Sequence, residues 1–196
     1  MRMITLALAA LAAGPAAAAA QGLSVNPYVG YYDFDESSLE DAVDDLETDG
    51  EILWGARVGF GSYEGVSWDL AYGRTSVTNR VIFQGETADR DEATIQLLYG
   101  AANWHLPIPG PLDLFVSGGV GAVQYDREEG DGQTDVLVNF GAGASLPIGP
   151  ARIRVDVKDH VDLCDANENF EFPDGPCFDD ATLQNIEISA GIVIGT

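Results

Sequence analysis

Residues 151–160 alternate between apolar and ionisable side chains without a break. The ionisable positions are Arg152, Arg154, Asp156, Lys158 and His160, and the apolar ones are Ala151, Ile153, Val155 and Val157. A period of two places the two sets on opposite faces of a β-strand, whereas a helical period would mix them. A soluble sandwich rarely holds so dense a row of charges of both signs. A membrane barrel, with lipid outside and a small polar interior, accounts for both faces.

Seven further segments resemble strands, at residues 23–34, 52–61, 66–73, 93–106, 112–122, 136–145 and 185–195. The segment at 93–106 is ambiguous, because it has apolar residues on both faces. Short connections rich in Gly and Pro (62–65, 107–111 and 147–150) alternate with longer acidic ones. An even strand number with this alternation is typical of bacterial outer-membrane barrels. We therefore predict an all-β fold, an eight-stranded antiparallel up-and-down transmembrane barrel with short periplasmic turns and long acidic extracellular loops.

The first twenty residues have the pattern of a secretory signal. Arg2 precedes an apolar run at residues 3–11, and small alanines continue to Ala20. We expect cleavage after Ala20, so that residues 21–196 form one barrel domain. No later segment approaches the roughly 20 uninterrupted apolar residues that a spanning helix needs. A chain of this kind can span a membrane only as a closed barrel, and the expected location is the outer membrane.

The charge is strongly segregated along the chain. The net charge is −23, although 46% of the residues are hydrophobic. The acidic residues gather in the stretches 33–51, 86–92, 126–135 and 162–180. Such a surface excludes nucleic acid as a partner, because binding a phosphate backbone requires basic residues. Cys164 and Cys177 lie in the last stretch, and in an exported protein we expect a disulfide between them, with a metal-binding pair as the less favoured alternative.

The acidic loops admit three interpretations: a solvated anionic surface, which we favour and which would suit a saline habitat, a divalent-cation site, and an adhesive surface. The candidate cation ligands gather around two glycines and are Asp126, Glu128, Glu129, Asp131 and Asp135. Clustered oxygen ligands suit hard cations, but the spacing does not match an EF-hand loop. In the first loop, Ser37 and Glu40 form a possible capping box for a short helix that would seal the barrel mouth.

The predicted inward faces collect four charges of each sign. These residues are Arg57, Asp69, Asp113, Arg152, Arg154, Asp156, Lys158 and Glu187. An interior of eight strands is just wide enough for side chains to fill it, and unpaired charges there are costly. We expect a lumen closed by ion pairs. The alternative is a narrow or gated ion path along the same row.

Several motifs resemble those of the small eight-stranded outer-membrane proteins related to the barrel domain of outer membrane protein A. They are NPYVGY from Asn26, WGARVG from Trp54, DLAYG from Asp69, GGVGA from Gly118 and VDVKDH from Val155. The resemblance covers essentially the whole chain after residue 20 and implies the barrel fold. It carries no catalytic residues across. It also implies insertion by the barrel assembly machinery, although such barrels usually end in an aromatic residue and this chain ends in Thr196.

We expect the protein to have no enzymatic activity and to bind no cofactor. The two histidines, His105 and His160, belong to no motif that joins them to a nucleophilic serine; Ser189 is the nearest candidate to His160. The expected function is that of a monomeric structural or surface-interaction protein in outer-membrane lipid. A small porin-like channel is one alternative. A soluble lipocalin-like carrier of an apolar ligand is another, and it is disfavoured because Tyr31, Trp54 and Tyr72 fall near loop ends and Trp68 near a turn end, as interfacial girdles do.

Overall fold

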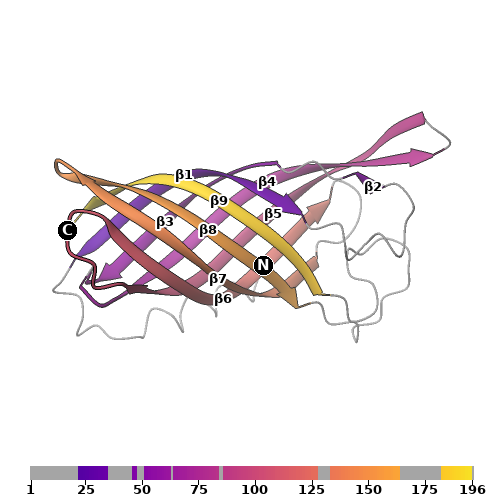
Figure 1. Cartoon of the computed structure of the whole chain (residues 1–196). Coiled ribbons are helices and arrows are strands. Elements are labelled where there is room, and N and C mark those ends of the chain that lie inside the picture. Colours follow the sequence, from indigo (N-terminus) through magenta and orange to yellow (C-terminus); the bar gives the residue numbers. More distant parts are fainter. Residues whose placement is uncertain are drawn as a thin grey trace.

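Eight long strands form a closed barrel in the computed structural model of the chain (Figure 1). The structure describes residues 22–34, 46–47, 51–62, 64–83, 86–127, 133–163 and 182–195. The barrel strands are β1 (Leu23–Phe34), β3 (Glu51–Gly61), β4 (Val66–Phe83), β5 (Glu86–His105), β6 (Asp113–Arg127), β7 (Gln133–Ile148), β8 (Ala151–Leu163) and β9 (Thr182–Gly195). A two-residue strand, β2 (Leu46–Glu47), pairs with the far end of β4.

Every barrel strand pairs antiparallel with its neighbours in sequence, and β1 closes the barrel against β9. The predicted eight-stranded antiparallel architecture is therefore confirmed. Closure satisfies the backbone groups of both edge strands, which is the condition for placing a sheet in lipid. Over the described ranges there is no helix of the length and apolar character needed to cross a bilayer.

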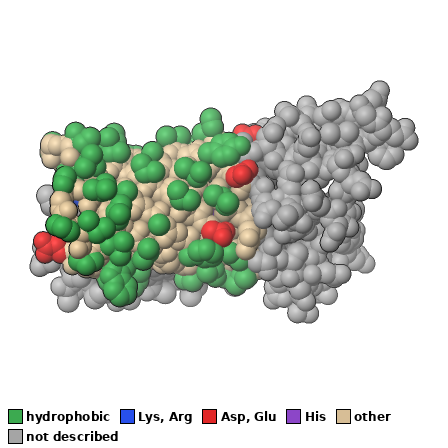
Figure 2. Space-filling view, viewed as in Figure 1, with side chains coloured by type: hydrophobic (Ala, Val, Ile, Leu, Met, Phe, Trp, Pro, Cys, Tyr) green, Lys and Arg blue, Asp and Glu red, His purple; other side chains and the backbone are tan. Residues whose placement is uncertain are grey.

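Alternation along the strands separates an apolar outer face from a polar inner face. In β8, Val155 and Val157 are 43% and 48% exposed, whereas Asp156 and Lys158 between and beside them are 0% and 1% exposed. Figure 2 shows hydrophobic side chains over the visible wall, with Asp and Glu toward its two ends. A lipocalin would have apolar residues inside and polar residues outside. The outer wall of this barrel is apolar instead, which a soluble carrier would not expose to water, and this rules out the soluble-carrier alternative.

The exposed aromatic side chains lie where the sequence places them. Trp54 and Tyr31 are both about half exposed near the loop ends of β3 and β1, and Trp68 is equally exposed near the turn end of β4. Their outward position fits interfacial girdles at the two edges of an apolar band.

One predicted long loop is instead a continuous hairpin. Strands β4 and β5 run on to Phe83 and from Glu86, so the acidic stretch 86–92 lies in a strand and not in a loop. In Figure 1 this hairpin projects beyond the ends of the other strands. The sequence prediction failed here because alternation marks a strand only where one face is buried, and the pairing register also shifts between Asn79 and Arg80. The loop between β6 and β7 likewise shortens to residues 128–132.

The three short connections are confirmed in place, with small changes in length. They comprise residues 62–65, 106–112 and 149–150. The last is a two-residue turn in which Gly149 has a φ of 60°, a left-handed conformation that glycine adopts without a steric penalty. The predicted helix at Ser37 and Glu40 lies outside the described residues, as do Cys164 and Cys177 of the predicted disulfide.

Candidate functional site in the barrel lumen

Arg57 of β3 is the centre of a buried ion-pair network in the lumen. Its Nη1 donates to Asp156 Oδ2 at 3.1 Å, and its Nη2 donates to Glu187 Oε1 at 2.6 Å and to Ser189 Oγ at 2.8 Å. The guanidinium also lies 3.8 Å from the centroid of the Tyr28 ring. Three strands, β3, β8 and β9, are thereby tied together across the interior. Removing one partner of such a buried pair would leave the other charge buried and unpaired, which is strongly destabilising.

Arg154 extends the network toward the turn end. It pairs with Asp69 at 2.8 Å and with Asp156 at 2.8 Å, so Asp156 is shared between two arginines. Asn103 donates to the same Asp69 carboxylate at 2.8 Å, and the Arg154 guanidinium lies 4.5 Å from the Phe115 ring centroid. The sequence placed Asp69, Arg154 and Asp156 on inward faces, and the structure shows that they meet.

The predicted pairing does not extend to Lys158. Its side chain is inward and buried, but its Nζ has no hydrogen-bond partner among the described residues and lies 5.0 Å from the Tyr99 ring centroid. The carboxylate of Glu187 is instead shared between Arg57 and the His160 Nε2, which lies 3.0 Å away. The side chain of His160 lies inside the lumen with no exposed surface.

Asp113 and Arg152 form a separate group at the turn end. The Arg152 Nη2 lies 3.7 Å from the Asp113 carboxylate, and Ser145 contacts both residues, donating to Asp113 at 2.9 Å and accepting from Arg152. Both ion-pair partners are partly exposed there. Seven of the eight predicted lumen charges are thus paired, in two groups at different depths.

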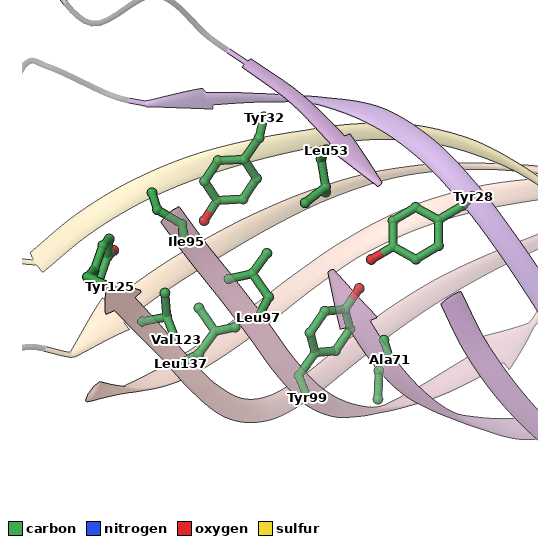
Figure 3. Packing of buried hydrophobic residues seen from close by; sticks show 11 residues of the cluster. Tyr28, Tyr32, Leu53, Ala71, Ile95, Leu97, Tyr99, Val123, Tyr125 and Leu137 are labelled. Carbon is green, nitrogen blue, oxygen red and sulfur yellow. The ribbon is translucent and has the colours of Figure 1, made fainter. Parts of the chain in front are cut away.

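An apolar block on the loop side of the lumen was not predicted. It is built from buried inward residues of five strands, among them Leu53, Ile95, Leu97, Val123 and Leu137, and is flanked by tyrosines. Figure 3 shows these side chains converging inside the barrel, with the hydroxyls of Tyr28 and Tyr99 directed toward each other. The only sequence signal was the segment at 93–106, in which apolar residues occupy both faces.

Inward glycines make room for the large side chains. A Cβ at Gly143 would lie 2.3 Å from Cζ of Phe115, and one at Gly55 would lie 2.7 Å from the Tyr28 hydroxyl. Real Cβ atoms do not approach other atoms so closely. Each of these glycines is the cross-strand partner of the aromatic residue on the adjacent strand, and its missing side chain leaves room for that ring in the narrow interior of an eight-stranded barrel.

The predicted cation ligands do not form a common site in the described part of the chain. Asp126 shares the outward face of β6 with Gln124, and its carboxylate accepts hydrogen bonds from Gln96 at 2.6 Å and from Gln124 at 2.8 Å. Asp135 lies on the inward face of β7, which it shares with Leu137, and it pairs with Val123 of β6. Glu128, Glu129 and Asp131 are outside the described residues. No group of three potential metal ligands is found among those that are described.

The comparisons with known proteins agree with the fold. Residues 4–171 match the family model of the outer membrane protein beta-barrel domain. The structure is similar to the crystal structure of Neisserial surface protein A, with a TM-score of 0.62 at 10% identity over 89% of this chain and 98% of that chain. It is also similar to the N-terminal β-barrel domain of Pseudomonas aeruginosa OprF, with a TM-score of 0.50 at 15% identity over 90% and 100% of the two chains. No curated protein matches the sequence.

The chain belongs to the outer membrane protein beta-barrel family. Its place is therefore the outer membrane, as the sequence predicted. At 10% and 15% identity the two structural likenesses show the fold alone.

Proposed function

We propose that this protein is a closed outer-membrane barrel with a structural or surface-interaction role. One observation carries the proposal: the ion pairs around Arg57 and the side chains of the apolar block all occupy the lumen and are buried from solvent. An ion could pass the charged residues only if the buried pairs separated, and the free-energy cost of separating them is too high. The apolar block has no polar groups that could replace the water shell of a passing ion. The activity is then to be sought in the surface beyond the barrel wall.

The channel alternative rests on the charged row of β8, in which Arg154, Asp156, Lys158 and His160 follow one another on the inward face. A row of this kind lines many pores. In this barrel, however, Arg154 and Asp156 contact each other, and the four side chains of the row are buried. The closed lumen is the better supported reading.

The proposal includes an orientation and a route. The signal at residues 1–20 would be cleaved after export, the barrel assembly machinery would insert the monomer, and the short turns would face the periplasm. The loop end, with the projecting β4–β5 hairpin, would face the cell exterior. Its acidic stretches would serve as a solvated anionic surface, and divalent cations would be the partners most suited to that charge.

Labelling of single cysteines on intact cells tests the orientation. In a background with Cys164→Ser and Cys177→Ser, a membrane-impermeant maleimide is expected to label Gln84→Cys, between β4 and β5. The matched variant Ile108→Cys, in an exposed turn at the other end, is expected to react only after lysis. Labelling of Ile108→Cys alone on intact cells would reverse the proposed orientation.

A further inference from the structure

Three residues at the turn end of the lumen form a hydrogen-bonded chain outside the Arg57 network. The Ser67 Oγ lies 2.8 Å from the His105 Nε2, and the His105 Nδ1 lies 2.8 Å and 3.0 Å from the two carboxylate oxygens of Asp113. Ser67 comes from the start of β4, His105 from the end of β5 and Asp113 from the start of β6. Three neighbouring strands thus bring together residues that no sequence motif connects.

The hydrogen-bond partners of the His105 ring favour one tautomer. A carboxylate only accepts hydrogen bonds, so the proton on the ring belongs to Nδ1, which faces Asp113. In this tautomer the Nε2 carries no proton and accepts the hydrogen bond of the Ser67 hydroxyl. Asn103 Nδ2 donates weakly to the same Ser67 Oγ at 3.4 Å, so the hydroxyl proton remains directed at His105. This is the relationship of nucleophile, base and orienting carboxylate that defines a Ser-His-Asp triad, whatever the fold.

The surrounding residues hold the carboxylate and the ring in place. Asp113 accepts a hydrogen bond from Ser145 at 2.9 Å and lies 3.7 Å from the Arg152 guanidinium. The ring of Phe115 packs against His105 with a centroid distance of 5.6 Å. An oriented carboxylate stabilises the imidazolium that forms when a histidine takes a proton from serine.

Ser67 also lines a small pocket at the turn end of the lumen. The pocket has a volume of about 20 Å³ and is bordered by Ser24, Asn26, Asp69 and Arg154. The side chain of Asn26 is 3% exposed, and neither its Nδ2 nor its Oδ1 has a hydrogen-bond partner among the described residues. A buried amide without a partner is costly, and a ligand in the pocket would relieve that cost.

We propose that Ser67, His105 and Asp113 form a hydrolytic site for short-chain carboxylic esters, with acetyl esters as the best fit. A pocket of this size holds little more than one water molecule, so it excludes a long acyl chain, and the alcohol part of the ester would have to lie outside it. The site lies at the opposite end of the barrel from the proposed interaction surface and goes beyond that function. It also departs from the expectation, based on the sequence alone, that the chain is not an enzyme.

The reaction follows from the positions of these groups. Ser67 Oγ attacks the ester carbonyl carbon while its proton passes to His105 Nε2, and the bond to the alkoxy oxygen then breaks as that oxygen takes the proton. Water repeats the sequence on the acyl-serine, so that one ester and one water give one acid and one alcohol. Asp113 is a positioning residue, because it acts through His105.

A covalent serine probe tests the site in the folded protein in detergent. A fluorophosphonate is expected to modify Ser67, as read by mass spectrometry of the labelled peptide, and p-nitrophenyl acetate is expected to be hydrolysed. Ser67→Ala should abolish the label and lower the hydrolysis rate by about 100-fold or more. The substitution removes one partly exposed hydroxyl, so folding is expected to persist, and heat-modifiable migration on a gel checks it.

Matched variants separate catalysis from packing. Ser117→Ala removes another inward serine and is expected to leave both readouts unchanged, whereas His105→Gln should lose both. An unlabelled Ser67, or hydrolysis by Ser67→Ala at the rate of the unsubstituted protein, would show that the chain of hydrogen bonds only seals the barrel end. Because detergent exposes both ends, that failure would leave the proposed closed lumen and orientation untouched.

Discussion

Replacing Arg57 with methionine is expected to lower the free energy of unfolding by about 3 to 5 kcal/mol. Methionine keeps much of the side-chain volume but leaves the carboxylates of Asp156 and Glu187 buried without their shared partner. Asp156 keeps its contact with Arg154, and Glu187 keeps its contact with His160. The substitution therefore removes one positive charge from the network without removing every partner of the two carboxylates. Urea unfolding of the protein in lipid vesicles, followed by tryptophan fluorescence, measures the change.

Arg152→Met is the matched control for that experiment. Arg152 lies at the turn end with a partly exposed side chain, and its distance to the Asp113 carboxylate is 3.7 Å. Ion pairs open to water contribute about 0 to 1 kcal/mol, so a much smaller loss is expected. Equal losses for the two variants would contradict the view that the Arg57 network is the buried tie of the lumen.

Leu97→Ala is expected to cost about 2 to 5 kcal/mol of unfolding free energy. The side chain is fully buried in the apolar block, where the positions across the barrel are occupied by large side chains and cannot collapse into the space. The same urea titration measures the effect. Leu112→Ala, in the turn before β6 where the side chain is 45% exposed, should cost clearly less. If the two variants lost the same amount, the block would not be a packed seal.

The barrel itself could be predicted because lipid outside and polar groups inside impose a strict period of two. The prediction failed in the β4–β5 hairpin, where the strands leave the wall and Phe83 and Glu86 no longer need to obey that period. The apolar block was not predicted, because its residues break the alternation inside the barrel wall. Leu97 and its neighbours are inward and apolar, which the pattern for a membrane strand does not allow, and 93–106 therefore looked ambiguous.

The partners within the lumen could not be predicted from the same pattern. Alternation assigns Arg57 and Glu187 to inward faces, but their depth depends on the register between strands and on the tilt of the barrel. These two residues are 130 positions apart in the chain and meet only once β1 closes against β9. The contact between Ser67 and His105 could not be predicted either, because it depends on the pairing of β4 with β5.

The conductance of the purified, refolded protein in a planar lipid bilayer tests the closed lumen most directly. Stable insertion without discrete conductance steps is expected, because buried ion pairs and an apolar block occupy the interior. Discrete steps that change in size when Arg154→Ala is introduced would show that the charged row lines an open pore, and they would contradict the closed lumen.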